Sequence, residues 1–136
     1  MGATVAKPSR TLRIFIVENH PDTLEGLTMY LRGLGHSIEA AHSMKEALTA
    51  LPNAKVDVLL SDIGLPDGDG WELLKRAGLP KSVYAIAMSG FGMGNDHRKS
   101  RAAGYTRHLV KPFDPMELDN ALEEAVAALP EQGEAE

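Results

Sequence analysis

The sequence predicts an α/β domain in which parallel strands form one sheet and helices cover both of its faces. Short apolar stretches alternate with amphipathic stretches along the 136 residues, and this alternation is typical of a parallel sheet with crossover helices. The stretches at residues 12–17, 56–60 and 83–88 are apolar almost throughout, as strands buried on both faces are. The length suits a single domain, which we expect at residues 11–129, between a flexible N-terminal tail and an acidic C-terminal tail at residues 130–136.

Local signals mark where the individual helices begin and end. Ser43 followed by Glu46 forms a capping box, which predicts the start of a short helix. Asp114 followed by Pro115 marks the start of the last helix, because aspartate is a good N-cap and proline suits the first helical position. In chain order, we expect strands at residues 12–17, 37–41, 56–60, 83–88 and 108–110, and helices at residues 21–34, 44–51, 70–77, 96–103 and 115–129.

Composition excludes several classes of function. The net charge of -5 and the lack of a basic run argue against nucleic acid as the main partner, because phosphate binding needs a clustered basic face. The chain has no cysteine, so disulfides, thiolate nucleophiles and cysteine-based zinc sites are excluded. No segment has the apolar length of a signal core or a membrane span. We therefore expect a cytoplasmic protein without a membrane partner.

Polar side chains follow four of the five predicted strands. Glu18 and Asn19 follow the first strand, Asp62 the third, Ser89 the fourth and Lys111 the fifth. The carboxyl ends of parallel strands meet at one edge of the sheet, where ligands bind in such folds. Each residue alone is common in a turn or an exposed loop, but their joint placement at the ends of four strands indicates a site.

These residue types suit phosphoryl transfer to an aspartate. Carboxylates hold Mg²⁺, a hard cation that prefers oxygen ligands. The cation offsets the repulsion between Asp62 and an incoming phosphate, so that the carboxylate can act as the nucleophile. Lys111 and Ser89 can then bind the remaining phosphoryl oxygens, since this chemistry depends mainly on positioning and charge stabilisation.

Four sequence segments resemble the receiver domain of two-component response regulators, and the resemblance covers residues 11–128. They are VENH at residues 17–20, LLSDIGLPDGDGWEL at 59–73, AMSG at 87–90 and HLVKPF at 108–113. The resemblance implies a flavodoxin-like, doubly wound fold with strand order 2-1-3-4-5. It also implies that Asp62 accepts a phosphoryl group from a histidine kinase or a histidine phosphotransfer protein.

The resemblance further implies roles for individual residues. Mg²⁺ would be held by Glu18, Asn19, Asp62 and the backbone carbonyl of Gly64. Ser89 would be the switch hydroxyl, Lys111 would bind the phosphoryl group, and the bond from Lys111 to Pro112 would be cis. The chain would act as a stand-alone receiver rather than as an enzyme, beyond self-phosphotransfer and slow autodephosphorylation. It would signal to a downstream protein through the last strand and its flanking helices, which could also form a homodimer.

Two residues depart from the family pattern. Asn19 stands where a second acidic residue is usual, so the site loses one charge and should bind Mg²⁺ more weakly than is usual for the family. His108 stands where the family often has a rotating aromatic residue, and it could be either a switch residue or a surface histidine. The first departure leaves open an alternative, a pseudo-receiver that binds proteins without being phosphorylated.

The residues present exclude two other interpretations, a phosphatase and a calcium-binding loop. A phosphatase of the haloacid-dehalogenase type needs a second aspartate two positions after the first, and Gly64 occupies that position. The stretch from Asp67 to Gly70 resembles the start of a calcium loop, but Gly78 stands where the closing glutamate is required. His20 could line the site at the sheet edge, although a position at the helix entry explains it as well.

Overall fold

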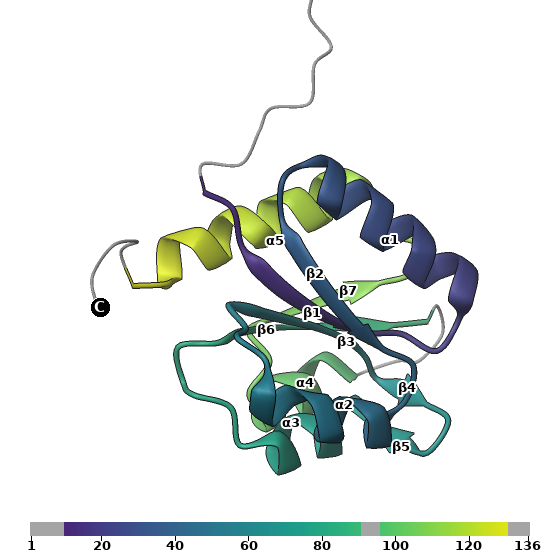
Figure 1. Cartoon of the computed structure of the whole chain (residues 1–136). Helices are drawn as coiled ribbons and strands as arrows, with labels where there is room; N and C mark the ends of the chain where they lie inside the picture. The colour runs from purple at the N-terminus through teal and green to yellow at the C-terminus, as the bar shows by residue number, and fades with distance from the viewer. Residues whose placement is uncertain (1–9, 91–95, 131–136) are drawn as a thin grey trace, which may run out of the picture.

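The computed structural model describes residues 10–90 and 96–130 of the chain (Figure 1). Residues 1–9, 91–95 and 131–136 lie outside the described residues, and with them most of the predicted tails at residues 1–10 and 130–136 and most of the glycine-containing loop after Ser89. The elements, in chain order, are β1 (Arg13–Val17), α1 (Pro21–Gly33), β2 (Ser37–Ala41), α2 (Met44–Ala50), the 3₁₀ turn η1 (Leu51–Asn53), β3 (Val58–Asp62), β4 (Gly64–Leu65), β5 (Gly68–Asp69), α3 (Gly70–Ala77), β6 (Tyr84–Ser89), α4 (Asp96–Ala103), β7 (Arg107–Val110) and α5 (Pro115–Ala128).

The main sheet has the predicted topology. Its five strands are parallel and lie in the order β2-β1-β3-β6-β7, which is the order 2-1-3-4-5 when the strands of this sheet alone are counted. Helices α1 and α5 cover one face, and α2, α3 and α4 cover the other (Figure 1). The antiparallel pair β4-β5 is an addition that the sequence did not predict.

Successive side chains of each strand enter two different cores. In β1, Ile14 and Ile16 pack on the side of α1 and α5, whereas Phe15 and Val17 pack on the side of α2 and α3. All four side chains are at most 2% exposed. Because both faces are covered, a strand here needs no polar alternation, which explains why the apolar runs predicted a parallel sheet correctly.

The third strand of the sheet lies two residues later than predicted. It runs from Val58 to Asp62, and Asp62 itself pairs with Met88 of β6. The predicted end at Leu60 was two residues short because the apolar run stops there, although the polar residues Ser61 and Asp62 continue the strand. Both residues are buried, so the carboxylate of Asp62 is held by the last residue of a central strand.

The N-terminus of α2 is capped by residues from two parts of the chain. Ser43 Oγ accepts from the backbone N–H of Glu46, as the capping box predicts. Asp67, in the turn between β4 and β5, accepts from the N–H groups of Met44 and Lys45 at 2.8 and 2.9 Å. The first free donors of a helix need such partners, and Asp67 therefore ties the β4-β5 pair to α2.

Helix α5 is joined to the rest of the fold by two tyrosines. The hydroxyl of Tyr30 in α1 donates to Asp119, and the hydroxyl of Tyr84 in β6 donates to Glu124. The N-cap of α5 is Asp114, whose side chain accepts from the N–H of Met116, as predicted. Among the described residues, no helix is both long and apolar enough to cross a membrane.

Candidate functional site

Three charged side chains meet at the carboxyl edge of the sheet. Lys111 Nζ, just after β7, lies 2.6 Å from Asp62 Oδ1 and 2.8 Å from Glu18 Oε1. The side chain of Glu18 is fully buried and that of Asp62 is 6% exposed, whereas Lys111 is 25% exposed. A buried carboxylate is costly unless it is paired, and here one ammonium group serves two carboxylates.

The two carboxylates differ in their hold on a proton. Burial, and then a hydrogen bond with Glu18, raises the pKa of Asp62 well above its ordinary value. Burial also acts to raise the pKa of Glu18, but hydrogen bonds from Asp62, Lys111 and the His20 backbone outweigh it and hold that pKa low. Burial acts to lower the pKa of Lys111, and its ion pairs with both carboxylates more than reverse this. Two adjacent carboxylates repel each other when both are charged. A further cation at this edge would reduce that repulsion and would therefore be bound favourably.

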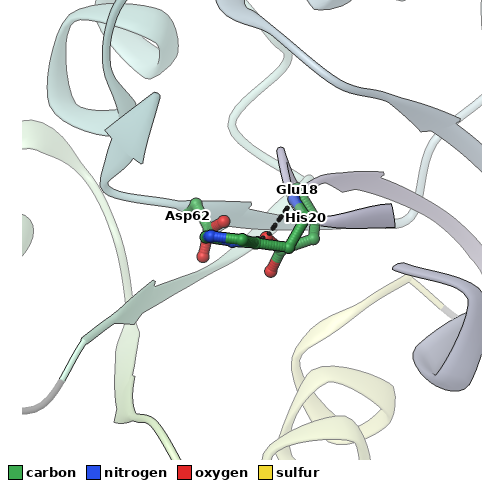
Figure 2. A group of neighbouring side chains, drawn as sticks. All are labelled: Glu18, His20 and Asp62. Carbon is green, nitrogen blue, oxygen red and sulfur yellow. Dashed lines mark hydrogen bonds and ion pairs between the residues drawn. The ribbon is translucent and has the colours of Figure 1, made fainter. Parts of the chain in front are cut away.

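His20 also joins this group, through the Glu18 oxygen that Lys111 does not contact. Its backbone N–H donates to Glu18 Oε2 at 2.9 Å, and its ring Nδ1 lies 3.1 Å from the same oxygen. Figure 2 shows the side chains of Glu18, His20 and Asp62 gathered at one point. One ligand atom from each of the three lies within 4.8 Å of the others. The neighbouring Asn19 is exposed.

Ser89 at the end of β6 contacts His108 of β7. Ser89 Oγ lies 2.7 Å from His108 Nε2, and the other ring nitrogen, Nδ1, lies 2.7 Å from Ser100 Oγ in α4. Both nitrogens of one imidazole are therefore used between two buried hydroxyls. His108 itself is half-buried.

The polar chain from Ser89 continues to the single tryptophan. The indole N–H of Trp71 in α3 donates to Ser100 Oγ at 3.0 Å, and the ring of His97 stacks on His108 with centroids 4.1 Å apart. Because an indole N–H can only donate, the hydroxyl of Ser100 must accept there and can give its own hydrogen to His108. The site is thus connected to α3 and α4 through Ser89, His108, Ser100 and Trp71.

Two glycines of the loop after Asp62 differ in their surroundings. Gly64 is exposed and pairs with Asp69 in the β4-β5 ladder. Gly70 is buried at the start of α3, where an added Cβ would lie 2.5 Å from the carbonyl oxygen of Asp62.

The bond between Lys111 and Pro112 is cis, as the resemblance implies.

Sequence reasoning placed Glu18, Asp62, Ser89 and Lys111 at one edge, and the structure brings them there. His20 was expected either to line the site or to stand at the helix entry, and it does both, as the N-cap residue of α1 in contact with Glu18. The signal for His20 was its position two residues after Glu18 at the end of a strand. No sequence signal pairs Ser100 with His108, because the contact depends on the rotamers of two side chains from different elements.

Comparisons with known proteins agree with this geometry. The model of the response regulator receiver domain matches residues 14–123. An uncharacterized 14.6 kDa protein of Leptolyngbya boryana is 33% identical over 120 residues, which are 86% of this chain and 92% of that protein. The two-component response regulator ARR11 of Arabidopsis thaliana is 31% identical over 109 residues, which are 79% of this chain but only 21% of that protein.

Solved structures show the same fold. A CheY-like receiver domain protein of Methanospirillum hungatei is 28% identical, with a TM-score of 0.80 and coverage of 88% of this chain and 97% of that one. The receiver domain of a Pseudomonas aeruginosa sensor histidine kinase, with magnesium ion coordinated in its active-site cleft, is 24% identical with a TM-score of 0.76, over 87% of this chain and 99% of that one. The family match over residues 14–123, on a sheet whose carboxyl edge holds Asp62, shows that this chain belongs to the response regulator receiver domain family.

Proposed function

We propose that Asp62 accepts a phosphoryl group and that the modified chain signals to a protein partner. The observation that carries this proposal is the buried contact of Asp62 with Lys111 at 2.6 Å, beside a second carboxylate on Glu18. Paired opposite charges at the end of a central strand are positioned for a reaction in which negative charge builds up near Asp62.

The transfer step follows from the residues around Asp62. A carboxylate oxygen of Asp62 attacks the phosphorus of a phosphohistidine or an acyl phosphate, an O–P bond forms, and the bond from phosphorus to the donor breaks. The ammonium group of Lys111 stays close enough to bind a phosphoryl oxygen, and Ser89 Oγ can bind another. The electron pair of the broken bond leaves with the donor, as imidazole or carboxylate.

Receiver domains bind Mg²⁺ in an acidic pocket, and the residues here fit a divalent cation. Glu18 and Asp62 supply oxygen ligands from buried positions, and the carbonyl of Gly64 and the amide of Asn19 are the other proposed ligands. When bound, the cation would neutralise charge on the transferring phosphoryl group. Because Asn19 is neutral, we propose weaker Mg²⁺ binding than is usual for the family.

The proposed partners are a phosphodonor protein and a downstream protein. Receiver domains interact with histidine kinases or histidine phosphotransfer proteins, and we propose one of these as the donor. The proposed output surface, or homodimer surface, comprises β7 and its flanking helices. Its support is that it carries two exposed large apolar side chains, Val110 of β7 at 37% and Met116 of α5 at 65% exposure.

Intact mass after incubation with acetyl phosphate tests the proposal. Wild type should gain one phosphoryl group when Mg²⁺ is present and none with EDTA, whereas Asp62→Asn should gain none under either condition. The asparagine is isosteric but cannot form the acyl phosphate. A phosphoryl gain in Asp62→Asn equal to that of wild type would contradict the assignment of the acceptor.

Asn19 favours a second candidate, a pseudo-receiver that binds its partner without phosphorylation. This reading predicts no phosphoryl gain in wild type, with acetyl phosphate or with a phosphorylated kinase, at any Mg²⁺ concentration. It also predicts that Asn19→Asp restores the gain, because a second acid would supply the missing charge.

We propose that Ser89 and His108 are the switch, and Trp71 provides its reporter. When the hydroxyl of Ser89 turns toward the phosphoryl group, it loses its 2.7 Å contact with His108. His108 also contacts Ser100, which accepts from the indole N–H of Trp71, so the environment of the indole should change as well. Phosphorylation of wild type should therefore shift the indole N–H resonance of Trp71. Ser100→Ala should keep the phosphoryl gain but lose most of this shift; an unchanged shift in that variant would show that the path does not run through Ser100.

A further inference from the structure

The strongest feature that the proposed function leaves unused is the imidazole of His20 beside the two carboxylates. Its side chain is 72% exposed, whereas that of its partner Glu18 is fully buried. An imidazole that is largely exposed to solvent thus lies beside two buried carboxylates (Figure 2). The sequence offers no second acid there, since Asn19 follows Glu18.

The two oxygens of Glu18 are divided between two partners. Oε1 is bound to the ammonium group of Lys111 at 2.8 Å, and Oε2 faces the backbone N–H and ring Nδ1 of His20. Nδ1 of His20 therefore lies beside the Glu18 oxygen that Lys111 does not hold, and one ligand atom from each of Glu18, His20 and Asp62 lies within 4.8 Å of the other two. A cation held there need not displace Lys111 from Glu18 Oε1 and Asp62 Oδ1.

We propose that His20 is a nitrogen ligand of the cation site, which gives the site a preference for imidazole-binding divalent ions such as Zn²⁺ and Co²⁺ over Mg²⁺. Carboxylate oxygens suit Mg²⁺, but an imidazole nitrogen adds affinity for Zn²⁺ and its first-row neighbours and little for Mg²⁺. Two oxygens and one nitrogen leave further positions for water or a phosphoryl oxygen, as an open site requires. This inference rests on the proposed function, because both use the same cation site.

The test is the affinity of purified protein for Mg²⁺, Co²⁺ and Zn²⁺, each measured alone by calorimetry. His20→Asn replaces the nitrogen ligand by an amide, and asparagine is a preferred residue before a helix, so α1 should still form. We expect Zn²⁺ and Co²⁺ affinity to fall by at least roughly tenfold, since losing even an outer partner of a ligand costs about 10–100-fold. Mg²⁺ affinity should change by less than about threefold.

His42 provides a matched control. Its Nδ1 lies 3.5 Å from Glu46 Oε1, and its side chain is 55% exposed, so it is also an imidazole beside a glutamate. Among the described residues, however, the group of three metal-ligating side chains contains His20 and not His42. His42→Asn should bind all three ions as wild type does, and ¹⁵N resonances of the rings should move on Zn²⁺ addition for His20 alone.

Either of two results would overturn the inference: equal loss of Zn²⁺ affinity in both variants, or no loss in His20→Asn. The proposed function is tested separately, because its readout is the Mg²⁺-dependent phosphoryl gain on Asp62. If that gain is absent while Zn²⁺ binding depends on His20, the cation site stands and the phosphoacceptor role fails. If the gain is present while Zn²⁺ binding ignores His20, the outcome is the reverse.

Discussion

Gly70→Ala should lower both the stability of the fold and the phosphoryl gain on Asp62. The new Cβ would lie 2.5 Å from the carbonyl oxygen of Asp62 and 3.1 Å from the Cα of Ile63, and both neighbours are backbone atoms. Relief therefore requires a backbone shift at the acceptor itself. Overpacking of this kind costs about 1–3 kcal/mol, sometimes more, and a misplacement of about 1 Å can slow a reaction by about 100-fold.

Urea unfolding and the acetyl phosphate assay measure the two effects. Gly26→Ala is the matched control, because a Cβ there meets nothing within 4 Å and the residue lies inside α1. That variant should be more stable than wild type by about 0.5–1 kcal/mol. If Gly70→Ala matched wild type in both assays, the close approach of α3 to Asp62 would be incorrect.

Phe15→Ala should have the largest effect on the free energy of unfolding. Phe15 is 1% exposed in the middle of β1, where its ring packs in the core under α2 and α3. Removing a buried phenylalanine side chain typically costs about 3–5 kcal/mol, from lost burial and the cavity left behind. Domains of this kind are stable by only about 5–15 kcal/mol, so the variant should be close to its unfolding transition at 37 °C.

Chemical denaturation at 25 °C checks this value. Met116→Ala, at a side chain that is 65% exposed, should stay within about 0.5 kcal/mol of wild type. A loss below about 1 kcal/mol for Phe15→Ala would mean that the neighbouring side chains collapse into the space.

Most of the fold could be predicted from the sequence because buried parallel strands have an unmistakable apolar pattern. The runs around Phe15, Leu59 and Ile86 each mark a strand covered on both faces. The pair β4-β5 could not be predicted, since strands of two residues are too short to show a period. The boundary of β3 was also missed, because Ser61 and Asp62 are polar residues held inside the sheet.

The site could be predicted as far as its residues follow strand ends. Glu18, Asp62, Ser89 and Lys111 have that position, and topology alone brings them together. Contacts that depend on side-chain direction could not be predicted. Which oxygen of Glu18 faces His20, and how His108 lies between Ser89 and Ser100, follows only from rotamers in the folded chain.

The contact of Asp67 with the start of α2 limits where this domain can be lengthened. Its two carboxylate oxygens span two N–H groups that lie 22 and 23 residues earlier in the chain, so an inserted residue in the β4-β5 turn would pull the cap from its helix. The turn between α3 and β6 is exposed at Pro80, Lys81 and Ser82. Exposed turns are where insertions are best tolerated. A fluorescent module or an affinity tag would therefore be accommodated in this turn, which leaves the contacts of Asp67 with Met44 and Lys45 untouched.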